Sequence, residues 1–273
     1  MKPNFLNHLL LICQCELKRL FTTGKGLLYL ITFALVWYFI LFYPIRLAAD
    51  MLWQGQYTAQ GANFFELIGF GSLLNWQIPE FGVFWRFALV MFPLLCVIIA
   101  ADQTCSDRER GTLRFLALRT SRESIFFGRF VGVMLIQAVL ILATLLTTLI
   151  LVIYRDANLL STAFNSALAI AVNLILVLLP FTAMMAALSA TVKSARQATV
   201  WAILIWSFLS GIISGLSYYL PGLDILKIMI PGYQVSELAQ LSEWNTLELA
   251  YIPLLQAAVL LVIGRWIMAR QIL

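Results

Sequence analysis

Residues 130–154 read FVGVMLIQAVLILATLLTTLILVIY, an apolar run without a single charged side chain. A helix needs about 20 mostly apolar residues to cross the hydrocarbon core of a bilayer. Five further runs of the same kind occur in the chain, and none has a charge at its centre. The sequence therefore predicts six transmembrane helices, with approximate ranges 27–43, 84–101, 130–154, 166–192, 198–220 and 249–268.

The composition of the 273 residues agrees with a membrane protein. Hydrophobic residues make up 62%, charged residues 11%, and the mean hydropathy is +0.92, which lies outside the range of soluble domains. An open sheet is excluded because lipid offers no partner for unpaired backbone groups. We therefore expect an all-α integral membrane protein that forms one transmembrane domain over residues 1–273.

The distribution of Lys and Arg predicts the orientation, because short cytoplasmic connections are enriched in these residues. One side of the predicted topology carries fourteen of them: Lys2, Lys18, Arg19, Lys25, Arg108, Arg110, Arg114, Arg119, Arg122, Arg129, Lys193, Arg196, Arg265 and Arg270. The other side carries only Arg46, Arg86, Arg155 and Lys227. Both termini are thus expected in the cytoplasm, and this topology explains the net charge of +5 without a nucleic-acid partner.

Residues 1–23 are expected to form an amphipathic helix on the cytoplasmic membrane surface rather than a cleavable signal peptide. Their apolar side chains recur at helical spacing, at Phe5, Leu9, Cys13, Leu17 and Leu20. A second special segment covers residues 220–248, where prolines and glycines break the chain before the last span. Its pieces 223–230 and 233–241 suit two short re-entrant or interfacial helices.

The most polar segment, residues 102–128, follows the second span and is expected in the cytoplasm. With Arg129 it reads DQTCSDRERGTLRFLALRTSRESIFFGR and holds ten of the 31 charged residues of the chain. Leu113, Leu116 and Ala117 would share one face of a short helix, while a solvated loop is the alternative. Thr120 and Glu123 have the spacing of a capping box, which predicts that the third span begins there.

At this segment the chain resembles the permease subunits of type 2 ABC exporters. These proteins carry an acidic residue, Gly-Thr-Leu, a short apolar piece, Ser-Arg and a Gly-Lys pair in the same connection. The matching residues are Glu109, Gly111-Thr112-Leu113, 115–118, Ser121-Arg122 and Gly128-Arg129. Two positions differ, since Thr120 replaces the usual proline and Arg129 the usual lysine.

The resemblance implies a subunit of the bacterial inner membrane that exports a substrate by alternating access. It would work as a dimer with a second permease copy or homologue, and with two separate ABC ATPases that bind ATP and Mg. A coupling helix would dock in the ATPase, and its residues are Asp107, Arg108, Glu109, Arg110, Gly111, Thr112, Leu113, Arg114, Leu116 and Arg119. Membrane lipid is an equally good partner for some of these arginines, because basic residues near anionic lipid gain on the order of 1 kcal/mol each.

The chain contains no G-x-x-x-x-G-K-[ST] loop, so energy from ATP has to come from another chain. Gln137 and Asn173 are the intramembrane polar residues that best mark a translocation path. Two sets of small residues share a helix face and permit close packing: Ser207, Gly211 and Gly215, and the pair Gly128 and Gly132. Such sets more often pack helices inside one bundle, and the alternative, a subunit interface, is where the resemblance would place the Ser207 set.

Other classes of function lack their chemistry in this sequence. His8 is the only histidine, so an intramembrane Ser-His enzyme and an H-E-x-x-H zinc site are not expected, and Cys13 and Cys15 have no further metal ligands nearby. A secondary transporter would need an acidic or basic group at mid-membrane. An ATP-independent channel or scaffold subunit stays open as the alternative. The apolar spans favour a hydrophobic or amphipathic substrate over a small ion.

Overall fold

The computed structural model describes residues 5–46, 76–219 and 226–270, and the regular elements in these ranges are all helical. Six helical segments are long and apolar enough to cross a membrane. Their ranges are Gly26–Ile45, Pro79–Glu109, Arg122–Arg155, Ala157–Thr191, Ala195–Leu216 and Tyr251–Arg270. The predicted all-α membrane protein with six spans is confirmed.

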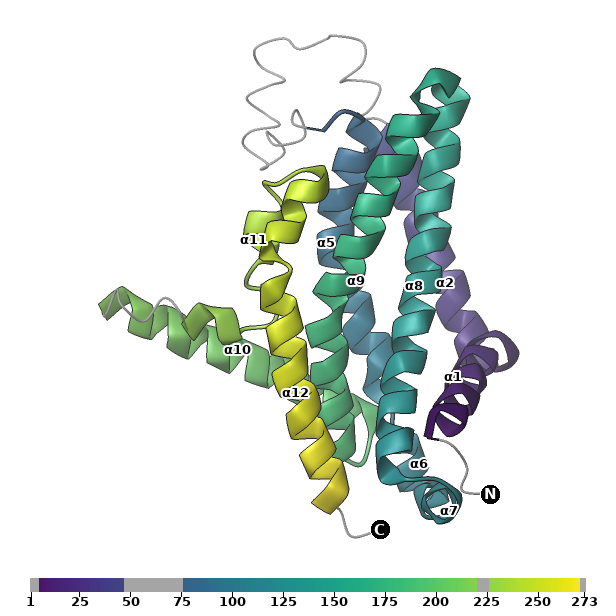
Figure 1. Ribbon diagram of the computed structural model, residues 1–273, viewed down its shortest axis with the longest axis vertical. Helices are drawn as coiled ribbons and strands as arrows, with labels where there is room; N and C mark the ends of the chain where they lie inside the picture. Colours follow the sequence, from purple (N-terminus) through teal and green to yellow (C-terminus); the bar gives the residue numbers. More distant parts are fainter. Residues whose placement is uncertain (1–4, 47–75, 220–225, 271–273) are drawn as a thin grey trace.

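The first two helices form an elbow. Helix α1 (Phe5–Thr22) lies beside α8, and α2 (Gly24–Ile40) rises from its end (Figure 1). Thr23 separates them and caps α2, because its hydroxyl accepts a hydrogen bond of 3.1 Å from the Gly26 N–H. At its far end α2 continues into the π-helical turn η1 (Leu41–Ile45), which contains Pro44.

The second span, α5 (Pro79–Ile99), leads through η3 (Ala100–Asp102) into two short helices, α6 (Cys105–Glu109) and α7 (Thr112–Arg119). The third span, α8 (Arg122–Arg155), follows at once. Its cap is Ser121, whose extended backbone lets the hydroxyl accept a hydrogen bond from the Ser124 N–H. The prediction that Thr120 caps this helix was wrong, because Thr120 ends α7 and donates to the Leu116 carbonyl.

Helices α8 and α9 (Leu160–Thr191) form a hairpin closed by η4 (Ala157–Leu159). With 34 and 32 residues, they are about 51 and 48 Å long at 1.5 Å per residue. Helix α9 is the centre of the bundle, since 72% of its most apolar 18-residue stretch is buried inside the protein. The last span, α12 (Tyr251–Arg270), runs along it (Figure 1).

Helix α10 (Ala195–Tyr219) leaves the bundle sideways (Figure 1). Only 11% of the most apolar 18-residue stretch of α10 is buried. Near the middle of this helix, the Trp206 indole N–H donates a 3.0 Å hydrogen bond to the Pro231 carbonyl. Most of this span is therefore free to meet lipid or another protein chain.

The segment before the last span contains two short elements, α11 (Val235–Leu238) and η6 (Glu243–Leu249). Of the two predicted helices, 233–241 corresponds to the single turn α11. The other is described only in part, as a 3₁₀ turn at 226–229, and its residues up to 225 lie outside the described ranges. Residues 1–4 of the predicted interfacial helix lie outside them as well.

Candidate functional site

The segment from α6 to α7 lies at the end of the bundle where α1, the start of α8 and the last turn of α12 also lie (Figure 1). We call this the α7 end. Between the two short helices the chain turns at Gly111, whose φ of +71° lies in the left-handed region that glycine adopts without strain. The Thr112 hydroxyl donates to the Asp107 carboxylate across this turn, at 3.1 Å.

Helix α7 is amphipathic, and its inner face is anchored in the protein. Leu113 is 2% exposed and belongs to a hydrophobic cluster with residues of α8, α9 and α12, against which Leu116 also packs. The helix is thus fixed to the bundle along one face, in agreement with the short helix predicted from the sequence.

The outer face of α7 carries two large apolar side chains that pack against little of the chain. Phe115 is 72% exposed and Leu118 is 84% exposed. Arg114 and Arg119 flank them and are exposed too. Exposed apolar side chains with a polar rim are typical of protein interaction sites, so this face suits a partner with an apolar groove and acidic borders.

The ten residues predicted for coupling fall into different environments. Glu109, Arg110, Thr112, Arg114 and Arg119 are exposed, whereas Gly111 is partly buried. Arg108 turns inward, because its guanidinium donates to the carbonyls of Thr191 (3.0 Å) and Val192 (3.4 Å) at the end of α9. Arg108 therefore ties α6 to α9 in this structure.

A buried ion-pair network connects the α7 end to α1. Arg129 of α8 binds the carboxylates of Glu16 in α1 and Asp107 in α6. Arg129 is 8% exposed and Glu16 9%. A second, more exposed pair joins Arg19 to Asp102 at 2.8 Å, and Asp102 also accepts from Ser106 of α6.

Burial changes the acidity of Glu16. Removal from water raises the pKa of this carboxyl, and the nearby Arg129 and Arg19 oppose the change without cancelling it. The buried Glu16 carboxylate therefore depends on its cationic partner Arg129.

Close helix packing surrounds this network. A Cβ atom on Gly132 would lie 3.0 Å from Cβ and Cγ of Glu16, and one on Gly128 would lie 3.0 Å from the side chain of Ile12. The Cys13 thiol also donates to the Gly128 carbonyl at 3.3 Å. These two glycines therefore seat α1 on α8 within one chain.

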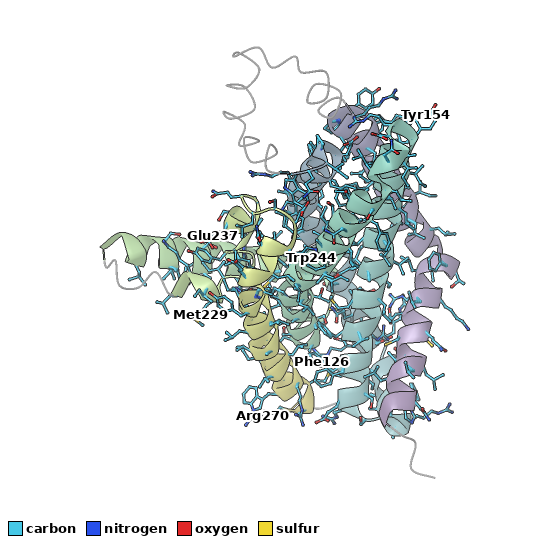
Figure 2. The ribbon with its side chains drawn as sticks, turned by 45° about the horizontal axis from the view of Figure 1, so that its top comes forward. Phe126, Tyr154, Met229, Glu237, Trp244 and Arg270 are labelled. Carbon is cyan, nitrogen blue, oxygen red and sulfur yellow. The ribbon has the colours of Figure 1, made fainter. Side chains whose placement is uncertain are left out.

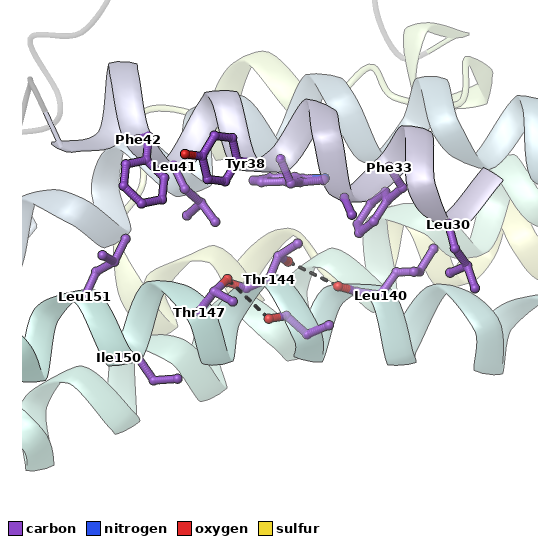
Figure 3. Close-up of a pocket in the computed structure, with 13 residues that line it drawn as sticks. Leu30, Phe33, Tyr38, Leu41, Phe42, Leu140, Thr144, Thr147, Ile150 and Leu151 are labelled. Atoms are coloured by element: carbon purple, nitrogen blue, oxygen red, sulfur yellow. Dashed lines mark hydrogen bonds between the residues drawn. The ribbon is translucent and has the colours of Figure 1, made fainter. Parts of the chain in front are cut away.

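The cavities between the described helices include one at the α7 end and one between α2 and α8. The smaller, of about 310 Å³, is at the α7 end and is bordered by the ion-pair network, including Glu16, Arg19, Asp102 and Glu109. The larger, of about 580 Å³, is a groove between α2 and α8 (Figure 3). Among the described residues, no charged side chain lines the groove. Its polar groups are the tips of Trp37 and Tyr38 and the hydroxyls of Thr144 and Thr147, and these hydroxyls donate to carbonyls of their own helix.

The polar residues predicted for a translocation path line neither cavity. Gln137 is buried and accepts a 3.1 Å hydrogen bond from the Thr182 hydroxyl, and Asn173 donates to the Ala169 carbonyl of its own helix. Both side chains form hydrogen bonds inside the bundle, and their role in transport stays a prediction. Within the described ranges, no group of three His, Cys, Asp or Glu residues is placed to hold a metal ion.

The small residues predicted for helix packing on α10 face open space. Ser207 is exposed, and among the described residues no atom other than the helix's own nearby backbone lies within 4 Å of a Cβ placed on Gly211 or Gly215. Their proposed contact with a second copy is neither supported nor opposed by the single chain.

Several residues of this site were not predicted from the sequence, among them Phe115, Leu118 and Glu16. Phe115 and Leu118 stand three positions apart on the side of α7 opposite to Leu113, a spacing that could have revealed a second apolar face. Glu16 lies three residues after Cys13, on the face of α1 that packs inward. A charge within an apolar stripe was the signal of a buried partner.

Comparison with known proteins adds one finding. Residues 11–266 match the profile of a family described as "ABC-2 family transporter protein". No curated protein matches the chain significantly.

Proposed function

Because the chain belongs to the ABC-2 transporter family and is a multi-pass membrane protein, we propose that it is the permease subunit of an ATP-driven exporter. A separate ABC ATPase would bind and hydrolyse ATP with Mg. Two permease chains, identical or homologous, would form the transmembrane part and move the substrate outward by alternating access.

The outer face of α7 is the observation that carries this proposal. Phe115 and Leu118 give it an apolar centre, and Arg114 and Arg119 a cationic rim. Interfaces owe most of their binding energy to a few large side chains at the centre, with polar groups around them. An ATPase groove with an apolar floor and acidic edges would complement this face, and Glu109 and Arg110 stand exposed beside it.

The location follows from the same face. An ATPase is available only in the cytoplasm, so the α7 end would face it, and the last turn of α12 lies there too (Figure 2, at Arg270). The excess of Lys and Arg expected on the cytoplasmic side agrees with this orientation. We propose a bacterial inner-membrane location with both termini in the cytoplasm.

The substrate is proposed to be hydrophobic or amphipathic. The groove between α2 and α8 is lined without a charged residue, and the six spans have no charged group at their centres. Such surfaces accept apolar molecules from the bilayer at low desolvation cost, whereas a small ion would find no counter-charge.

Affinity purification of the tagged chain from its native membrane in mild detergent tests the proposal. We expect an ABC ATPase to copurify and the complex to hydrolyse ATP. The double variant Phe115→Ser, Leu118→Ser should lose the ATPase, while Tyr154→Ser, which alters the 92% exposed Tyr154 at the opposite end (Figure 2), should retain it. A well-folded chain that never binds an ATPase would instead indicate a channel or a scaffold subunit.

A further inference from the structure

We propose that Arg129 is the residue that passes movement of the α6–α7 segment to α1, through its contacts with Asp107 and Glu16. This inference rests on the proposed permease function and assigns the step that follows ATPase docking. Arg129 would act as a positioning residue, since it contacts neither ATP nor substrate.

The three side chains form one electrostatic unit across three helices. One guanidinium nitrogen of Arg129 binds Asp107 of α6, and another binds Glu16 of α1. Arg129 and Glu16 are almost fully buried. Separating Arg129 from Glu16 would take the close cation away from a buried carboxylate, which is unfavourable. Separating Arg129 from Asp107 would take it away from a carboxylate that is only 20% exposed. When α6 moves, Arg129 would therefore follow Asp107, and Glu16 would follow Arg129.

Helix α1 can carry such a displacement to the first span. It is seated on α8 at Gly128 and Gly132, where no larger side chain fits without a shift. At the elbow, a Cβ on Gly26 would overlap the Leu20 carbonyl, so the end of α1 and the start of α2 are in direct backbone contact. Movement of α1 is therefore transmitted to α2 with little slack.

Other contacts of the segment lead elsewhere or are weaker. Arg108 joins α6 to the end of α9 and does not reach α1. The Arg19–Asp102 pair does reach α1, but its side chains are 41% and 30% exposed, so water screens the attraction. Among the described contacts between α1 and this segment, the one through Arg129 is the buried one.

The test uses the purified complex of the chain with its ATPase and measures amide hydrogen exchange with and without ADP and vanadate. Two peptides are followed, one covering α7 and the other α1. The main variant is Asp107→Asn, which keeps an oxygen for Thr112 and leaves the Arg129–Glu16 pair intact but removes the charge on α6. The matched control is Glu123→Gln, which breaks the exposed pair between Glu123 and Arg265 at the same end.

In the wild type and in the control, we expect nucleotide to change the exchange of both peptides. In Asp107→Asn the response of α7 should persist, and that of α1 should fall at least fivefold. If this variant does not yield an intact complex, Glu16→Gln replaces it, because this change leaves the Arg129–Asp107 pair intact and removes the charge on α1.

A full response of α1 in these variants would overturn the proposal. So would a variant in which α1 exchanges faster without nucleotide yet responds normally, because Arg129 would then have only a structural role. If no ATPase binds, or if α7 of the wild type does not respond, the proposed docking fails first, and the transmission step falls with it.

Discussion

The ring of Phe126, on α8, lies directly against Gly264, on α12. A Cβ atom placed on Gly264 would be 2.5 Å from Cζ of Phe126 and 3.3 Å from Cα of Ala187, on α9. Three helices thus meet at a point where only a hydrogen atom fits. Phe126 belongs to the hydrophobic cluster that also holds Leu113 of α7, so the same packing supports the position of α7.

We therefore expect Gly264→Ala to destabilise the protein by about 1–3 kcal/mol, the usual cost of overpacking a filled core. The free energy of unfolding can be measured in detergent micelles by denaturant titration. Gly211→Ala is the matched control, because the part of the chain that the structure describes places no neighbouring side chain or helix within 4 Å of the new methyl group. It should change the stability by less than about 0.5 kcal/mol. Equal effects of the two variants would contradict the packing described here.

The segment before α12 provides a second prediction. The Trp85 indole N–H, which is buried in α5, donates a 3.0 Å hydrogen bond to the Leu238 carbonyl of α11. Trp85→Phe would leave this carbonyl buried without its donor, which costs about 1–3 kcal/mol. Trp244→Phe removes a similar bond, to Asn165, at an exposed site (Figure 2) and should cost much less.

Hydrogen exchange of the 235–238 peptide measures the local effect of both changes. Faster exchange in Trp85→Phe, with little change in Trp244→Phe, is the expected result. Comparable exchange in both variants would mean that the Trp85 bond does not hold α11 in place.

The spans could be predicted from the sequence because a bilayer imposes a length and a polarity on every crossing helix. Their arrangement could not. Helices α9 and α10 are both apolar enough to cross a membrane. Yet 72% of the most apolar stretch of α9 is buried inside the protein, and only 11% of that of α10. Lipid tails and a protein interior are equally apolar, so an apolar side chain does not reveal which of the two it meets.

The candidate site, too, could be predicted from the sequence only in part. The position of α7 and its buried Leu113 followed from local helical spacing. The pairing of Arg129 with Glu16 joins residues 113 positions apart, and it depends on how α1 sits on α8. No local pattern contains that register. Arg108 was predicted to take part in coupling, which stays a prediction; its hydrogen bonds to the carbonyls at the end of α9 join residues far apart in the sequence, so no local pattern could show them.

The raised pKa of Glu16 predicts a dependence of stability on pH. A carboxyl whose pKa is higher in the folded than in the unfolded state binds its proton more tightly when folded. Its contribution to stability is therefore complete below the unfolded value, near 4.5, and is lost as the pH rises through the folded value. Glu16→Gln, which cannot ionise, should lack this part of the pH dependence.

Unfolding of the wild type and of Glu16→Gln at several pH values between 4 and 8 checks this expectation. The stability of the wild type relative to the variant should decrease as the pH rises. An increase would mean that the attraction of Arg129 outweighs the cost of burial, and that the pKa of Glu16 is lowered instead.

The open face of α10 makes the last prediction. Ser207, Gly211 and Gly215 are four residues apart, so they share one face, and the described chain leaves this face uncovered. Small residues let two helix backbones approach closely in a membrane, where packing is the main source of attraction. If a second permease copy covers this face, Gly211→Leu should weaken the dimer at least tenfold without unfolding the monomer.

Gly24→Leu, at another glycine with open space around it among the described residues, should leave the dimer intact. Energy transfer between labelled chains in lipid vesicles, diluted stepwise with lipid, measures the dissociation. The same dissociation curve for Gly211→Leu and the wild type would show that the two copies meet elsewhere and that lipid covers α10.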